Sequence, residues 1–131
     1  SKNEGIDFFV TTNFGTYLLY PGKQIKIPSG IKVKMPEGYC LIAFNKSGIA
    51  AKYGLSIGAC VVDENYTGEL HLHLFNISDQ VAKIKSDQKI VQFLMLKPNY
   101  TQIEEVKNEN DMFDKSDYKE RGDNGFGSTG E

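Results

Sequence analysis

The sequence contains no tryptophan, few cysteines and no apolar run long enough to cross a membrane as a helix. Its net charge of −2 lacks the basic excess that a general nucleic-acid-binding protein shows. No leader with a charged and then an apolar part precedes the first motif. We therefore expect no nucleic-acid partner and no membrane association, and an intracellular location, either cytoplasmic or nuclear.

Residues that commonly bind metals are also scarce. Cys40 and Cys60 lie in apolar runs without the spacing of zinc ligands, which excludes a disulfide framework and predicts two buried free thiols. His71 and His73 lie two residues apart and could bind a metal from one strand face. A solvated strand face is favoured, because no third ligand accompanies them.

The 131 residues are enough for one domain, and a hydrophobic fraction of 40% predicts a packed core. We expect that core over residues 1–100. Residues 104–120 contain seven acidic residues and three lysines with little apolar pattern, so residues 101–120 are interpreted as an acidic linker. A glycine-rich C-terminal arm, residues 121–131, follows the linker.

Short apolar runs between residues 17 and 96 predict β-strands. Ile25–Ile27 and Ile31–Met35 alternate apolar residues with lysine, and Leu70–Leu74 alternates leucine with histidine. Only Gly48–Tyr53 suggests a helical turn. Many short strands with almost no helix indicate an all-β fold, either a β-sandwich, a jelly roll or a barrel.

The arm carries the strongest single motif. Residues 127–129, Gly-Ser-Thr, offer backbone N–H groups and hydroxyls for an anion, and Arg121 offers a planar donor fork. Phe126 presents an aromatic face suited to a nucleotide base. A P-loop is excluded because Ser128 stands where its lysine belongs. A disordered terminus remains the alternative to nucleotide binding.

Four weaker segments precede the arm. Gly58–Glu69 is interpreted as a β-hairpin in which Asp63 ends an apolar strand, as either a general base or a turn-former. Ser47 and Gly48 open the helical turn, either as a phosphate site or with Ser47 as an N-cap. The other two segments are a strand with one amide that we expect to be buried, Gln92, and a short stretch around Asp7.

Taken in order, these segments resemble the five motifs of the homotrimeric dUTPase family. The resemblance covers nearly the whole chain, and its third and fifth motifs are quite specific together. The five matching segments are Gly5–Phe8, Lys46–Ala50, Gly58–Gly68, Lys89–Phe93 and Arg121–Gly130.

The resemblance implies a jelly-roll or distorted-barrel fold, and Mg²⁺-dependent hydrolysis of dUTP to dUMP and pyrophosphate. Such an activity limits uracil incorporation into DNA and supplies dUMP. It implies a homotrimer with shared active sites, in which Asp63 activates the attacking water and Asp7 holds Mg²⁺ through water. The substrate-binding residues that it implies are Lys46, Ser47, Gly48, Cys60, Val61, Asn65, Tyr66, His71, Gln92, Arg121, Phe126, Gly127, Ser128 and Thr129.

By the same resemblance, Tyr66 packs under the deoxyribose, and the backbone around Cys60, Val61 and His71 reads the edge of uracil. Ser47 and Gly48 of the second motif and Gln92 of the fourth bind phosphate oxygens. The arm closes over the base and the γ-phosphate. Alternatives within the same scaffold are a non-catalytic dUTP sensor and, less favoured, a dCTP deaminase.

This sequence departs from the family pattern at several places, among them Asn65, which takes the place of a frequent aspartate. Lys46 stands where arginine is usual, and Asn45 where proline is usual. Lysine keeps the charge but loses the bidentate donor fork. In the fourth motif, Asp87 and Gln88 replace the customary Gly-Asp pair.

Overall fold

The computed structural model describes residues 4–114 and 116. Strands dominate these residues, and the helical turn expected at Gly48–Tyr53 is present as one short helix. The elements in chain order are β1 (Ile6–Phe9), β2 (Thr16–Leu19), β3 (Gln24–Pro28), β4 (Cys40–Asn45), α1 (Ser47–Tyr53), β5 (Leu55–Ile57), β6 (Val61–Val62), β7 (His71–Asn76), β8 (Ala82–Lys85), β9 (Lys89–Leu96) and the 3₁₀ turn η1 (Glu109–Asp111).

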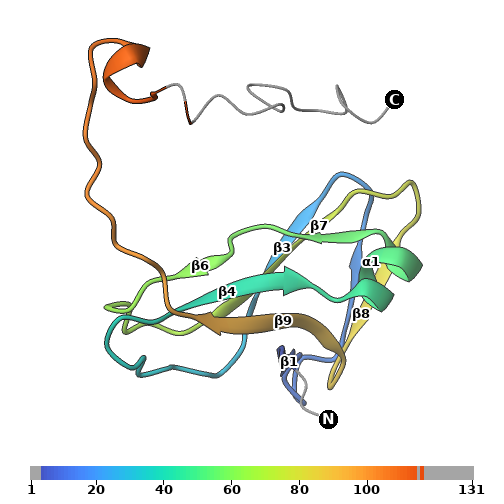
Figure 1. The fold of residues 1–131 in the computed structure, drawn as a ribbon. Helices are drawn as coiled ribbons and strands as arrows, with labels where there is room; N and C mark the ends of the chain where they lie inside the picture. Colours follow the sequence, from blue (N-terminus) through green and yellow to red (C-terminus); the bar gives the residue numbers. More distant parts are fainter. Residues whose placement is uncertain (1–3, 115, 117–131) are drawn as a thin grey trace. The chain divides into compact units, whose positions relative to one another are not determined.

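The strands of the described residues form three antiparallel sheets. Their orders are β1-β9-β4-β6, β2-β8 and β3-β7-β5, and none of the three closes into a barrel. Figure 1 shows β9 lying along β4, with α1 directly after the end of β4. The all-β, jelly-roll-like prediction is confirmed.

The three leucines of the alternating segment Leu70–Leu74 lie in the hydrophobic core. Leu70, Leu72 and Leu74 are at most 2% exposed and pack with residues from the other sheets, including Phe93. His71, which points the other way, is exposed. Because successive side chains on a strand point to opposite faces, the leucines alone determine which face of β7 is buried.

Residues 31–35 were predicted as a strand, and that prediction is wrong. Met35 is buried and Val33 half-buried, so the alternation is partly kept, but the segment joins no sheet. Its one hydrogen bond to another backbone segment runs from the Leu70 N–H to the Ile31 carbonyl at 2.9 Å. Alternation reports which side chains are buried, whereas a strand also needs a neighbour that exchanges hydrogen bonds.

The turn before β9 explains why Asp87 replaces glycine. Its φ is 65°, the only positive value at a non-glycine residue among the described residues. Aspartate tolerates this left-handed conformation better than most residues. Its carboxylate also accepts a hydrogen bond from the Thr12 hydroxyl at 2.7 Å, which ties two turns together.

The chain divides into two units between Asn99 and Tyr100, and the nine strands belong to the first. In the second, η1 is capped by the Asn108 side chain, which accepts from the Asn110 N–H at 3.0 Å. The linker and arm boundaries expected from the sequence remain predictions. Within residues 4–114 and 116, no helix has the length and apolar character to span a membrane.

Candidate functional site

A pocket of about 300 Å³ lies between β6, the segment that follows it, and β7. Five residues that the family resemblance assigned to substrate or catalysis line this one pocket. They are Cys60, Val61, Asp63, Tyr66 and His71. Lys26, Glu69 and His73 line it too, although none of them was predicted to bind substrate.

The pocket opens where the chain changes sheets. Up to Gly58 the chain follows β7, and the Gly58 N–H donates to the His73 carbonyl at 2.9 Å. From Cys60 onward it follows β4, because the Ala43 N–H donates to the Cys60 carbonyl at 2.8 Å. The predicted β-hairpin is therefore wrong, since β6 and β7 belong to different sheets.

Two hydrogen bonds within the chain hold Tyr66 in place. Its hydroxyl donates to the Glu69 carbonyl at 2.8 Å, and its N–H donates to the Asp63 carbonyl at 3.1 Å. A Cβ at Gly68 would collide with the Tyr66 ring, so only glycine permits this packing. The aromatic face is thus presented at a defined position beside Asp63.

Asp63 follows the last residue of β6 and is exposed at the pocket. Among the described residues, no donor is paired with its carboxylate. A carboxylate with free lone pairs beside a pocket can accept a hydrogen bond from water and take its proton.

Cys60 is exposed, which corrects the prediction of two buried thiols, whereas Cys40 is buried as expected. The apolar neighbours of Cys60 suggested a buried strand. At this position, however, the chain is crossing between two sheets, and the residue lines the opening that results.

His73 does not lie on a solvated face as expected; it is half-buried and both ring nitrogens are engaged. The Ala59 N–H donates to Nδ1 at 2.7 Å, and Nε2 lies 2.7 Å from Oε1 of Gln24. Burial lowers the pKa of His73 below its usual 6.5, and the nearby Lys26 ammonium lowers it further. In the part of the chain described, no three His, Cys, Asp or Glu residues cluster as metal ligands.

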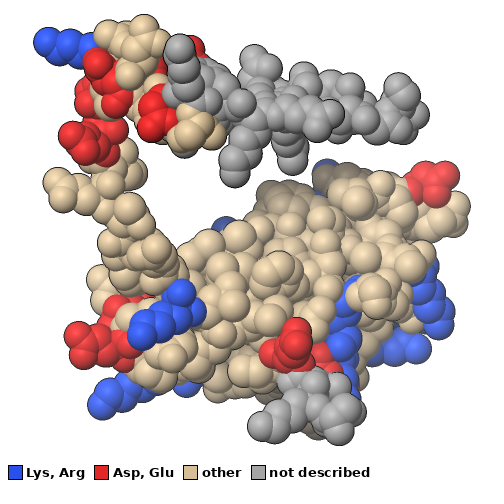
Figure 2. Space-filling view, in the orientation of Figure 1, with Lys and Arg blue, Asp and Glu red and all other residues tan. Residues whose placement is uncertain are grey.

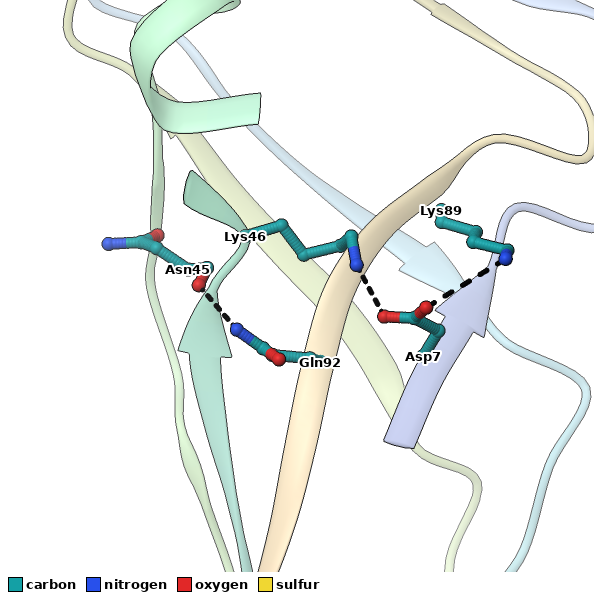
Figure 3. A network of polar contacts seen from close by, with 5 residues as sticks. All are labelled: Asp7, Asn45, Lys46, Lys89 and Gln92. Atoms are coloured by element: carbon teal, nitrogen blue, oxygen red, sulfur yellow. Dashed lines mark hydrogen bonds and ion pairs between the residues drawn. The ribbon is translucent and has the colours of Figure 1, made fainter. Parts of the chain in front are cut away.

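A second polar group lies at the other end of β4 (Figure 3). Asp7 on β1 pairs with Lys46 at 2.5 Å and, more loosely, with Lys89 at 3.9 Å. Gln92 on β9 donates to the Asn45 carbonyl at 2.8 Å. The end of β4 thereby lies beside Asp7 of β1 and Gln92 of β9, which brings together residues of three motifs. They are Asp7, Lys46 with the adjacent Ser47, and Gln92.

Asn45 replaces the rigidity of the usual proline with a hydrogen bond. Its side-chain oxygen accepts from the Ile57 N–H at 2.8 Å, which ties the end of β4 to β5. The N-cap position of α1 is occupied by Lys46, and no side chain caps that end of the helix. The alternative in which Ser47 is the N-cap is therefore wrong, because Ser47 is already the first helical residue.

The structure does not bring the pocket and the second group together within one chain. None of Lys46, Ser47, Gly48 and Gln92 lines the pocket. Asp63 follows the residue paired with Leu41, which brings it level with Cys40. Lys46 follows the end of β4, six residues or about 20 Å further along at 3.3 Å per residue. Asn65 lines an adjacent hollow with Tyr66. The arm residues Arg121, Phe126, Gly127, Ser128 and Thr129 lie outside the described residues.

Comparison with known proteins shows the family of this chain. The sequence profile of the dUTPase family matches residues 5–130. The chain belongs to the dUTPase family. Two mammalian relatives are named deoxyuridine 5'-triphosphate nucleotidohydrolase: the human mitochondrial protein, 33% identical over 114 residues, and the mouse protein, 31% identical over 130 residues. The alignments cover 87% and 99% of this chain, but 42% of the human protein and 74% of the mouse protein.

Solved dUTPases have the same fold. The native EIAV dUTPase is 27% identical with a TM-score of 0.71, and the match covers 83% of this chain and 87% of that one. The dUTPase of Staphylococcus bacteriophage 80alpha, solved with dUpNHpp, is 22% identical with a TM-score of 0.77 over 98% of this chain and 87% of its own. At 22% identity, the similarity to the phage protein supports the fold alone.

Proposed function

We propose that this dUTPase-family chain hydrolyses dUTP to dUMP and pyrophosphate, with base and sugar held in the pocket beside β6 and β7. The observation that carries the proposal is the pocket itself. Five residues assigned by family resemblance line it, although β6 and β7 belong to different sheets.

Asp63 is the proposed general base. A water held by its carboxylate attacks the α-phosphorus, a new P–O bond forms, and the bond to the β-phosphate oxygen breaks. The proton of the water passes to the carboxylate, and pyrophosphate leaves. The exposure of Asp63 and its lack of a paired donor in the described residues support this role.

Substrate selection is assigned to the pocket walls. The ring of Tyr66, held by its bond to the Glu69 carbonyl, leaves no room for a 2′-hydroxyl under the sugar. The backbone around Cys60, Val61 and His71 reads the uracil edge, where a fixed donor and acceptor pattern discriminates between bases better than apolar contact does.

The donor set fits Mg²⁺ only as an ion carried mainly by the substrate. Asp7 offers one carboxylate, 31% exposed, and Mg²⁺ commonly takes one or two carboxylates together with water and phosphate oxygens. We assign Asp7 to hold the ion through water, which would neutralise charge on the triphosphate. The ion would compete with Lys46, the present partner of Asp7.

We assign the triphosphate to Lys46, Ser47, Gly48 and Gln92 of a neighbouring copy, in a homotrimer with shared sites. The separation of these residues from the pocket within one chain supports that arrangement. The β1-β9-β4 sheet also exposes large apolar side chains that a neighbour could cover: Ile6, Phe9, Phe44, Met95 and Leu96 are 38–49% exposed. Figure 2 shows that the face carrying β4 and β9 is largely uncharged, with charged residues mostly towards its margins.

The arm residues complete the proposal by family resemblance, with Phe126 on the base and Arg121, Gly127, Ser128 and Thr129 on the γ-phosphate. Absence of nucleic-acid and membrane partners, and an intracellular location, remain predictions from the sequence.

The test is pyrophosphate release from dUTP, dCTP, dTTP and UTP, each with Mg²⁺ and with excess chelator. We expect rapid release from dUTP alone, abolished by the chelator. Binding of dUTP without release would contradict hydrolysis and favour the sensor alternative. Release of ammonia from dCTP would favour the deaminase.

A further inference from the structure

The sheet crossing at Ala59 leaves a gap in the backbone hydrogen bonds, and the His73 side chain fills it. The Gly58 N–H donates to the His73 carbonyl at 2.9 Å, the last backbone bond between this segment and β7. The next N–H, that of Ala59, donates to Nδ1 of the same histidine at 2.7 Å. One residue of β7 thus binds two successive N–H groups, and its ring lies at the point where the pocket opens.

These contacts specify one form of the imidazole. A backbone N–H can only donate, so Nδ1 must accept and carries no proton. The neutral ring then has its proton on Nε2, which donates to Oε1 of Gln24 at 2.7 Å. Gln24, on β3, therefore orients the ring through Nε2, and the ring binds the Ala59 N–H through Nδ1.

The ring also fits closely against the chain that it holds. A Cβ at Gly58 would overlap several atoms of the imidazole, so the absence of a side chain there lets the ring approach. The Phe75 ring lies on the same strand, with its centroid 4.9 Å from that of His73. His73 is thus confined between the Gly58 backbone, Gln24 and Phe75.

We propose that His73, oriented by Gln24, is a positioning residue that sets the position of the Ala59–Val61 backbone, and does so only in its neutral form. The consequence for dUTP rests on the proposed function, in which this backbone reads uracil. Protonation of Nδ1 would set two N–H donors against each other, so the ring and the Ala59 segment would separate. Uracil binding should weaken, while the step at Asp63 keeps its geometry.

Other charged groups face this histidine from the elements around it. Lys26 is its cross-strand neighbour on β3, and its charge opposes protonation of the ring. Glu69 is engaged with the Gly30 N–H at 2.7 Å. The remaining titratable groups lining the same pocket are Cys60, Asp63, Tyr66 and His71.

The direct test is the protonation state of the ring, measured by nitrogen NMR on the full chain without nucleotide. The sequence has two histidines, so His73→Asn identifies the His73 signals. We expect an unprotonated Nδ1 and a protonated Nε2 at neutral pH, with titration below that of a free histidine. A proton on Nδ1 at neutral pH would overturn the proposal whether or not the chain hydrolyses dUTP.

The functional test compares two variants. Asn places its side-chain oxygen where Nδ1 lies, so His73→Asn can still accept from Ala59 but cannot be protonated. In the wild type, KM for dUTP should rise by about fivefold as the ring is protonated, as expected for one lost hydrogen bond, with kcat changing little. In His73→Asn that rise should be absent. His73→Leu should show the high KM at every pH.

Gln24→Glu sharpens the test, because a carboxylate beside Nε2 favours the protonated ring. The KM inflection should move to higher pH. Gln80→Glu adds the same charge at an exposed position in the β7–β8 turn and should leave the inflection unchanged.

A wild-type KM that does not change with pH, or an inflection that persists in His73→Asn, would overturn the positioning role. Absence of dUTP hydrolysis at any pH would instead overturn the proposed function, and the NMR result would still decide the state of His73.

Discussion

The two polar regions of the core differ in how complete they are within one chain. Around the pocket, Tyr66 and Ala59 are held by hydrogen bonds to their own chain, and Asp63 is left without a paired donor in the described residues. At the other end of β4, Asp7 and Lys46 neutralise each other. Under the proposed function, the residues for base and sugar are thus already positioned, whereas triphosphate binding would have to replace an existing ion pair.

The largest expected effect tests the free carboxylate of the pocket. Asp63→Asn keeps the shape of the residue but cannot take a proton, so kcat should fall by about a thousandfold. Affinity for dUTP should stay within about tenfold, or roughly 1.4 kcal/mol. Rapid quench measurement of turnover and calorimetry of binding give the two values. Turnover near the wild-type rate would show that another group is the base.

The next effect tests whether the Tyr66 ring in the pocket wall selects the sugar. Tyr66→Ala removes the ring that we assign to exclude the 2′-hydroxyl, so preference for dUTP over UTP should drop by about a hundredfold. Tyr66→Phe is the matched control, because it loses only the hydrogen bond to Glu69 and should retain most of the preference. The ratio of kcat/KM for the two nucleotides measures both. Unchanged selectivity in Tyr66→Ala would remove the sugar role from this ring.

A smaller effect is expected at the ion pair. Asp7→Asn should raise the Mg²⁺ concentration for half-maximal activity by about tenfold. Thermal unfolding should shift little, because the pair is partly exposed and such pairs contribute at most about 1 kcal/mol. Lys89→Gln, which removes only the longer contact at 3.9 Å, is the control. An Mg²⁺ requirement that does not change would contradict the role of Asp7.

The smallest effect is on stability as a function of pH. The pKa of His73 is lowered in the folded chain, mainly by burial, so the unfolded chain binds its proton more readily. The stability that this confers is present above the ordinary value of 6.5 and is lost as pH falls through the folded value. Chemical denaturation should show a small fall on acidification that His73→Asn lacks. An equal fall in both proteins would assign it to other groups.

Features set by local sequence were predictable. The alternation at Leu70–Leu74 identified β7 and its buried face, and the small residues after Ser47 identified α1. Family resemblance, rather than periodicity, brought the pocket residues together, since Asp63 alone is an ordinary turn residue. The pairing of Asp7 with Lys46 joins residues 39 apart in sequence and was not predicted.

Features set by long-range pairing were not predictable. The Gly58–Glu69 segment was taken for a hairpin because nothing local reveals that Val61 and Val62 pair with β4 instead. Cys60 was expected to be buried for the same reason. His73 gave a misleading signal, because a histidine on the polar side of an alternating strand usually contacts solvent, not a backbone N–H from a neighbouring segment.

The most direct test of the shared site places the pocket substitution and the phosphate-site substitutions on different chains. The Asp63→Asn chain and a Ser47→Ala, Gln92→Ala chain are co-expressed with different tags, and trimers carrying both tags are purified. If one copy supplies the pocket and a neighbour the phosphate residues, about one site in three should be intact in every mixed trimer. We expect dUTP turnover near a third of the wild-type rate, although each variant alone is nearly inactive. Mixed trimers as inactive as their parents would contradict the shared site.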